Sequence, residues 1–90
     1  MQLARVTGTI TATAKSAQLV GAKMLICDMT DAHGAIIEAA CIAIDTVGAG
    51  VGDQVLVVRG SAARMALLAN VAPVDAAVIA IVDTVTVKAK

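Results

Sequence analysis

The chain has 90 residues, a net charge of zero and no Phe, Trp or Tyr. Its length allows one small domain, residues 1–90, and the scattered charge and missing aromatic rings exclude the basic, base-stacking surfaces of nucleic-acid-binding proteins. Hydrophobic residues make up 59% of the chain and seven more residues are Gly, against roughly 45–50% for both together in ordinary globular proteins.

This apolar surplus exceeds what one small core can bury, because a chain of this length hides only about 60–65% of its unfolded surface. A membrane-spanning helix needs about 20 mostly apolar residues, whereas the longest apolar run is residues 76–82, closed by Asp75 and Asp83. Residues 1–5 lack the apolar segment of a signal peptide. We therefore expect no membrane partner, and the surplus predicts contacts with other protein chains.

The first predicted strand covers residues 3–13. Its residues alternate between a small or apolar face, which carries Val6, Gly8 and Ile10, and a polar face rich in threonine. Alternation with a period of two and many β-branched residues is typical of a half-buried strand. A loop is expected after it, at residues 15–21.

Residues 23–29 and 36–44 are the second and third predicted strands. The segment between them, residues 30–34, reads T-D-A-H-G and carries the Asp and Gly that turns favour. The two strands are therefore expected to form a hairpin.

Three predicted strands are apolar on both faces: residues 36–44, 54–59 and 78–82. In the first of them, Ile42 lies on one face and Ile37 on the other. A strand that is apolar on both faces is usually covered on both. We expect neighbouring subunits to hide some of these outer faces.

Two short helical pieces are also expected. Residues 61–68 begin with a Ser of the kind that caps helices, and Pro73 opens a single turn before the last strand. Residues 84–88 alternate again. Five short strands separated by turns predict an all-β domain, a closed antiparallel OB-like barrel with one or two short helices.

The segment from Asp45 to Asp53 reads D-T-V-G-A-G-V-G-D and is the most distinctive motif. A dinucleotide site needs G-x-G-x-x-G leading into a helix, but Gly48, Gly50 and Gly52 give G-x-G-x-G and a predicted strand follows. The Gly-Lys pair of a P-loop is also missing. The segment is therefore predicted to be a structural loop that needs positive φ angles or close backbone approach, near the symmetry axis of a ring of subunits.

No catalytic, cofactor-binding or metal site is predicted. His33 is the only histidine and lies at the hairpin tip, where nothing local supports a catalytic triad. Together with Cys27 and Cys41 it does not offer the ligand spacing of a zinc site. The cysteines are interpreted as small, buried core residues with free thiols, which favours a reducing, cytoplasmic setting.

Arg59 and Arg64 flank a Gly-Ser turn. Pairing with an aspartate is the favoured interpretation, because a guanidinium forks well onto a carboxylate. The alternative is an anion site made by these arginines and the glycine amides. In that case the chain would be a small OB-like binding module for an anionic ligand or a nucleic acid.

Four segments resemble one known family. They are the opening M-Q-L-A-R-V-T-G-T-I-T-A-T, residues 19–26, the block I-D-T-V-G-A-G-V-G-D-Q-V-L-V-V-R-G-S-A-A-R, and the ending P-V-D-A-A-V-I-A-I-V-D. These segments are similar to bacterial microcompartment vertex proteins, the ethanolamine-utilisation and carboxysome pentamers of the EutN/CcmL type. The resemblance covers nearly the whole chain, and the glycine-rich block followed by G-S-A-A-R is its most specific part.

The resemblance implies a five-stranded OB-like barrel that forms a homopentamer and caps the vertices of a polyhedral protein shell in the bacterial cytoplasm. It implies no catalytic activity and no cofactor. The implied partners are other copies of the chain and the hexameric or trimeric shell proteins of the same microcompartment. The residues implied at the subunit interface or near its axis are Asp45, Gly48, Ala49, Gly50, Gly52, Asp53, Ser61 and Arg64.

Overall fold

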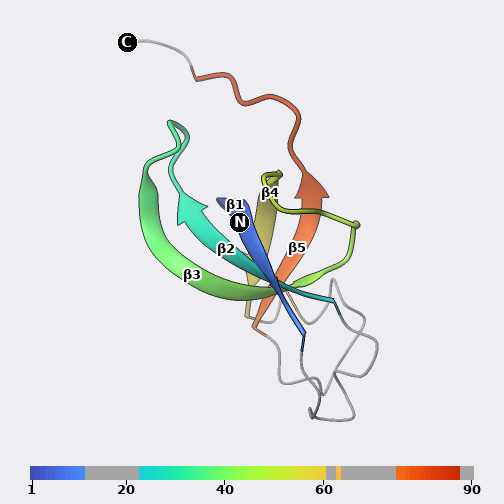
Figure 1. Ribbon diagram of the computed structural model, residues 1–90. Coiled ribbons are helices and arrows are strands. Elements are labelled where there is room, and N and C mark those ends of the chain that lie inside the picture. Colours follow the sequence, from blue (N-terminus) through green and yellow to red (C-terminus); the bar gives the residue numbers. More distant parts are fainter. Residues whose placement is uncertain (12–22, 61–62, 64–74, 88–90) are drawn as a thin grey trace.

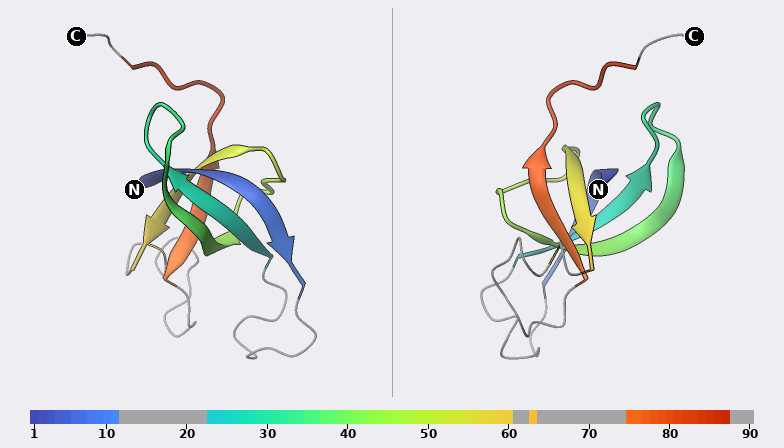
Figure 2. Two further views of the ribbon diagram at one scale, coloured as in Figure 1. Left: turned by 60° about the vertical axis from the view of Figure 1, so that its left-hand side comes forward. Right: turned by 180° about the vertical axis from the view of Figure 1, so that it is seen from behind.

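The computed structural model describes residues 1–11, 23–60, 63 and 75–87. Its strands are β1 (Gln2–Ile10), β2 (Met24–Thr30), β3 (Ile36–Asp45), β4 (Gln54–Arg59) and β5 (Ala76–Ile81). They close into a barrel in the order β1-β2-β3-β5-β4 (Figure 1, Figure 2). The expected all-β fold with a closed five-stranded barrel is therefore confirmed.

Several expectations fall outside the described residues. They are the end of the first strand at residues 12–13, the loop at residues 15–21, the turn at Pro73 and nearly all of the helix at residues 61–68, of which only Ala63 is described. In the described part of the chain, no helix has the length and apolar character needed to cross a membrane.

One pair of strands is parallel, which corrects the expectation of a wholly antiparallel barrel. β3 and β5 run parallel through Ile44↔Ala77 and Asp45↔Val78, whereas the other neighbouring strands are antiparallel. The reason is topological: five is an odd number, so strand directions cannot alternate at every step around a closed ring. Thr46 extends this closure, because its N–H and its Oγ1 both donate to the Val78 carbonyl, at 3.2 and 2.6 Å.

β2 and β3 form the expected hairpin. The Asp31 carboxylate accepts hydrogen bonds from the backbone N–H groups of His33 and Ala35, at 2.8 and 3.0 Å. Gly34 has a φ of 89°, a left-handed conformation that glycine adopts at no steric cost. The Asp and the Gly therefore make the turn in the way that the sequence predicts.

A bulge at Thr7 interrupts the pairing of β1 with β2. Val6 lies opposite Cys27, but Gly8 lies opposite Ile26, so Thr7 is an extra residue on β1. An extra residue moves the residues after it to the other face of a strand. The register with β2 therefore shifts beyond Thr7, although the predicted alternation in burial continues, with Gly8 and Ile10 half-buried and Thr9 exposed.

A second bulge bends β3. Asp28 of β2 lies opposite two residues of β3, Ala39 and Ala40. Ala40 has a φ of 56°, which is uncommon for a residue other than glycine. Its N–H donates to the Asp28 carboxylate at 2.9 Å, and this bond holds the backbone in the bulged conformation.

The barrel is filled by small and medium-sized apolar side chains. The buried core consists of Ala4, Val6, Leu25, Cys27, Met29, Ala43, Ala49, Val55, Val57, Ala76 and Val78. A separate cluster joins Val58, Ala63 and Ala77, with Ile79 packed against it. Part of the second apolar face of β4 and β5 is therefore covered within the chain rather than by a neighbouring subunit.

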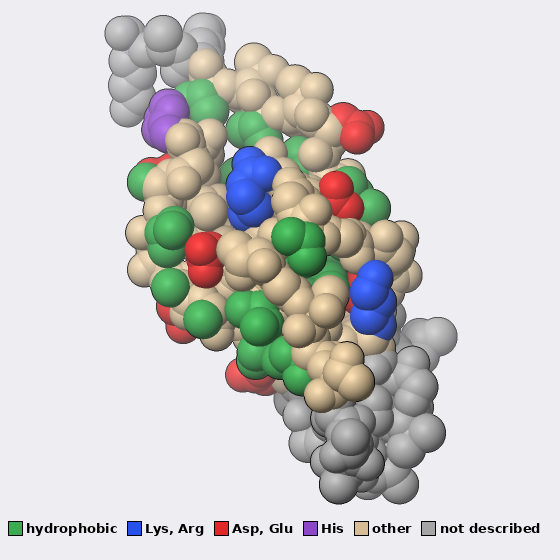
Figure 3. Space-filling model, viewed as in Figure 1, with side chains coloured by type: hydrophobic (Ala, Val, Ile, Leu, Met, Phe, Trp, Pro, Cys, Tyr) green, Lys and Arg blue, Asp and Glu red, His purple; other side chains and the backbone are tan. Residues whose placement is uncertain are grey.

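Three isoleucines of β3 stay uncovered in the single chain. Ile36, Ile37 and Ile42 are 60%, 64% and 46% exposed. In the space-filling view, hydrophobic side chains gather over the flank where β3 lies (Figure 3). Val82 still donates to the Gln54 carbonyl of β4 at 2.7 Å, and residues 83–87 then lead away from the barrel (Figure 1).

The barrel closure leads to a first prediction. Thr46→Val removes the hydroxyl bond to the Val78 carbonyl and leaves the backbone bond in place, so the free energy of unfolding should fall by about 1 kcal/mol. Urea unfolding followed by circular dichroism measures this change. The matched control is Thr86→Val, an exposed threonine outside the sheet, which should change the value by less than about 0.5 kcal/mol. Equal effects of the two substitutions would show that the hydroxyl does not support the closure.

Candidate functional site

The glycine-rich loop, residues 45–53, connects β3 to β4. It begins where β3 meets β5 at the closure of the barrel and ends beside β1. The three ribbon views agree that this loop and the arm of the β2–β3 hairpin lie on opposite sides of the barrel (Figure 1, Figure 2). The loop therefore lies on the side of the barrel that the hairpin arm does not cover.

The two aspartates that bound the loop bind its backbone amides. The Asp45 carboxylate accepts hydrogen bonds from the N–H groups of Val47 and Gly48, at 3.0 and 3.1 Å. The Asp53 carboxylate accepts one from the N–H of Gly50 at 2.8 Å. Asp and Asn commonly fix turns by such bonds to their own backbone, and here one such turn lies at each end of the loop.

Asp45 is the better buried of the two loop anchors. Only 2% of its side chain is exposed, and the Lys23 ammonium lies 3.5 Å from it. Burial acts to raise the pKa of the Asp45 carboxyl, but the amide bonds within the loop and the Lys23 ammonium outweigh it and lower the pKa. Lys23 also donates to the Ala49 carbonyl at 2.8 Å, so one ammonium binds both the carboxylate and the middle of the loop.

The end of the loop is fixed to β1. The Gly52 N–H donates to the Val6 carbonyl at 2.9 Å, and the Val6 N–H donates to the Asp53 carbonyl at 3.0 Å. The Arg5 guanidinium donates to the Gly52 carbonyl at 2.8 Å. The loop is therefore held at its start by Lys23 and at its end by β1.

The three glycines of the loop have different roles. Gly48 and Gly52 have φ angles of 83° and 94°, whereas Gly50 does not have a positive φ. A Cβ added at Gly50 would meet only the Asp53 Oδ2 atom, at 3.9 Å, which is an ordinary contact. A positive φ is thus confirmed for Gly48 and Gly52. For Gly50 only the other part of the prediction, close approach of another backbone, remains, and no contact within the single chain requires its small size.

The loop has a buried centre and exposed flanks. Ala49 is fully buried and belongs to the barrel core. Val47 and Val51 point outward and are 40% and 65% exposed. The loop is therefore a fixed, partly apolar surface rather than an open backbone cradle.

This geometry disfavours the alternative of an anion-binding module. The N–H groups of Gly48 and Gly50 already bind the loop's own carboxylates, and that of Gly52 binds a carbonyl. Arg59 is paired with Glu38 at 3.0 Å, so the partner predicted for this arginine is a carboxylate as expected, but a glutamate rather than an aspartate. Of the donors in that alternative, those within the described residues are therefore already paired, and Arg64 lies outside them.

Ser61 and Arg64, the remaining residues expected at the interface, lie outside the described residues. Sequence reasoning missed Lys23 and Arg5 as residues that hold the loop. Lys23 binds Ala49 across 26 positions of the chain and Arg5 binds Gly52 across 47. No local pattern signals contacts of such separation.

Nothing in the described residues assembles a reaction centre. They contain no group of three or more His, Cys, Asp or Glu side chains that could hold a metal ion. His33 lies at the exposed tip of the hairpin, where its backbone binds Asp31.

Comparisons with known proteins point to the same family as the glycine-rich block does. A family model described as "Ethanolamine utilisation protein EutN/carboxysome" matches residues 1–83. The chain is 46% identical to the carboxysome shell vertex protein CcmL of Thermosynechococcus vestitus over 86 residues, which are 96% of this chain and 87% of that protein. It is 44% identical to the bacterial microcompartment shell vertex protein EutN of Salmonella typhimurium over 90 residues, 100% of this chain and 91% of that protein.

A solved structure is similar over the same length. The GrpN pentameric microcompartment shell protein from Rhodospirillum rubrum superimposes with a TM-score of 0.86 at 37% identity, covering 99% of this chain and 100% of that one. The likeness therefore extends over the whole barrel and is not confined to the loop.

The buried carboxylate leads to a second prediction. Asp45→Ala should lower the free energy of unfolding by about 2 kcal/mol at neutral pH, because it removes charge-assisted hydrogen bonds to several loop donors. The pKa of Asp45 is lowered by folding, so its contribution is complete above the ordinary carboxyl value of 3.8. That contribution is lost as the pH falls through the lower pKa of the folded state.

Urea unfolding at a series of pH values tests this expectation. The gap between wild type and Asp45→Ala should narrow only in acid, below the ordinary carboxyl range. Asp83→Ala, which replaces an exposed aspartate beyond β5, is the control and should run parallel to wild type. A gap that is constant with pH would show that the ionised carboxylate does not hold the loop.

Proposed function

Because the chain belongs to the EutN/CcmL family, we propose that it is a non-catalytic shell vertex protein of a bacterial microcompartment. It forms homopentamers that cap the vertices of a polyhedral shell in the bacterial cytoplasm. One observation carries this proposal: the whole chain is about 45% identical to proteins named as shell vertex proteins. The pentameric state of a solved relative of the same length supports it.

The surface of the barrel fits a closed ring of copies. Such a ring is heterologous, so each subunit must present two different patches that bind each other. The exposed isoleucines of β3, including Ile37, form one candidate patch, and the glycine-rich loop with Val47 and Val51 forms the other. The two lie on different flanks of the barrel (Figure 2), so one copy can bind a neighbour through each of them.

Gly50 is suited to the contact between these patches. It needs no special backbone conformation within the chain, and the loop around it is fixed by Asp45 and Asp53. A glycine in a fixed, exposed loop lets another backbone approach closely. The loop residues from Asp45 to Asp53 are therefore proposed as a joint between subunits, near the axis of the ring.

The other partners are shell proteins of the same compartment. The pentamer occupies a vertex, so its rim contacts hexameric or trimeric shell proteins. No nucleic acid, membrane, cofactor or substrate takes part in this function, because the role is to complete a protein surface. The glycine-rich loop accordingly serves assembly rather than chemistry.

Native mass spectrometry tests the assembly directly. Five copies of the 9.0 kDa chain give an expected particle of about 45 kDa, held together chiefly by burial of apolar surface. Size exclusion over a range of concentrations should show the same species. A monomer that persists at all concentrations would contradict the proposal.

A pair of variants tests the two patches separately. Gly50→Val should abolish the pentamer while leaving the barrel folded, since its Cβ meets only an ordinary contact in the single chain. Ile37→Asp should do the same from the other patch, because Ile37 is 64% exposed and its replacement leaves the core intact. Native mass spectrometry reads the assembly, and circular dichroism reads the fold.

Mixing the two variants distinguishes a head-to-tail ring from other assemblies. Each variant keeps one intact patch, so the mixture should yield a heterodimer and no larger ring. Gly48→Ala is the control for backbone strain, because a φ of 83° costs an alanine roughly 1–2 kcal/mol. A mixture that restores pentamers, or a Gly50→Val protein that assembles normally, would rule out this pair of patches.

A further inference from the structure

The two cysteines of the chain lie directly opposite each other on neighbouring strands. Cys27 of β2 and Cys41 of β3 are register partners in the antiparallel hairpin. Cys27 is fully buried in the barrel core, and Cys41 is partly buried and packs against the same core cluster. Both are free thiols, so this position holds a pair of thiols on one face of the sheet.

The backbone spacing at this position suits a disulfide. Residues directly opposite in an antiparallel pair have Cα atoms about 4.5 or 5.5 Å apart, depending on the hydrogen-bonding class. Disulfides span Cα distances of roughly 4.4–6.8 Å. Both classes fall in this range, so a bond between Cys27 and Cys41 requires side-chain rotation but no movement of the strands.

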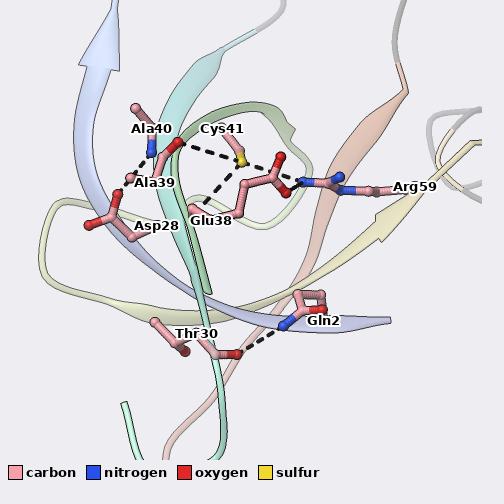
Figure 4. A network of polar contacts seen from close by, with 8 residues as sticks. All are labelled: Gln2, Asp28, Thr30, Glu38, Ala39, Ala40, Cys41 and Arg59. Carbon is pink, nitrogen blue, oxygen red and sulfur yellow. Dashed lines mark hydrogen bonds and ion pairs between the residues drawn. The ribbon is translucent and has the colours of Figure 1, made fainter. Parts of the chain in front are cut away.

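Cys41 is the thiol that a reagent meets first. Its sulfur lies 3.4 Å from the Arg59 guanidinium, which donates to it, and 4.0 Å from the carbonyl oxygens of Glu38 and Ala39 (Figure 4). Glu38, Ala39 and Arg59 are all exposed, so the Cys41 sulfur lies close to solvent. Cys27, in contrast, has no exposed surface.

The pair also lies at a mechanically distinct place in the fold. The bulge of Ala39 and Ala40 immediately precedes Cys41 on β3. On the far side of the bulge, β3 pairs with β2 only, since its contact with β5 is limited to Ile44 and Asp45. A crosslink between the cysteines would therefore fasten the arm of the hairpin at the point where it leaves the barrel.

We propose that Cys27 and Cys41 are a dithiol site that takes a small disulfide, such as oxidised glutathione, and becomes a cross-strand disulfide. The Cys41 thiolate attacks one sulfur of the reagent, forms a mixed disulfide and releases one glutathione thiolate. The Cys27 thiolate then attacks the Cys41 sulfur and releases the second. Two electrons pass from the protein to the reagent, and the two thiol protons pass to the released thiolates.

Burial lowers the rate of this exchange, because it raises the pKa values of both thiols. It raises the pKa of Cys27, and the neighbouring Cys41, Asp28 and Asp45 raise it further. Burial likewise raises the pKa of Cys41, and Glu38 adds to this effect while Arg59 opposes it. Because the thiolate is the attacking species, both steps should be slow at neutral pH and faster in alkaline buffer.

Incubation of the folded protein with oxidised glutathione tests the site. Intact mass under denaturing, non-reducing conditions should show the loss of two hydrogen atoms per chain and no retained glutathione. Proteolytic cleavage after Glu38 should leave the two fragments joined until a reductant is added. This readout uses the wild-type chain alone, so it does not depend on whether a variant folds.

Two matched variants separate the steps. Cys27→Ala should stop at a mixed disulfide of Cys41 with glutathione, and Cys41→Ala should stay unmodified for as long as the barrel remains folded by circular dichroism. Wild-type protein that keeps glutathione on Cys41, or that forms disulfide-linked dimers instead, would overturn the proposal. So would a folded chain that resists oxidation under conditions in which the urea-unfolded chain forms the bond.

Discussion

An odd number of strands cannot alternate in direction around a closed ring, and the rest of this structure depends on how the chain meets that constraint. β3 and β5 run parallel over two register pairs, and Thr46 adds two hydrogen bonds to Val78 just beyond them. The last residue of β3 in this contact is Asp45, which also begins the glycine-rich loop. The position of the loop is therefore determined by the closure of the barrel, and a change in one is transmitted to the other.

The loop resembles a phosphate site because its glycines expose backbone amides. In this protein, however, carboxylates of the same chain bind those amides. The carboxylates of Asp45 and Asp53 take the amide donors, and the Lys23 ammonium balances the buried charge. A buried carboxylate with these partners is stabilised in its ionised form. The same motif chemistry that binds nucleotides elsewhere is here used to hold a short segment in one conformation.

Much of the fold follows from local patterns, and the exceptions have non-local causes. Strand positions and the hairpin turn are predictable because period-two alternation and an Asp–Gly turn act within a few residues. The bulges at Thr7 and Ala40, and the bond from Lys23 to Asp45, depend on residues brought together only by the closed barrel. Gly50 shows the limit on the site itself: its lack of a positive φ is a property of the folded loop, and three alternating glycines look equivalent in the sequence.

A loop that is hydrogen-bonded at its start, its middle and its end has a consequence for how copies of the chain meet. It does not have to become ordered when a neighbour arrives, so association loses little conformational entropy at this surface. A ring of five closes only if each joint turns the next subunit by one-fifth of a circle, because any angular error is repeated at every joint. If the loop is the joint proposed above, the hydrogen bonds of Asp45 and Asp53 inside each protomer would help to set that angle, and with it the curvature of the shell at its corners.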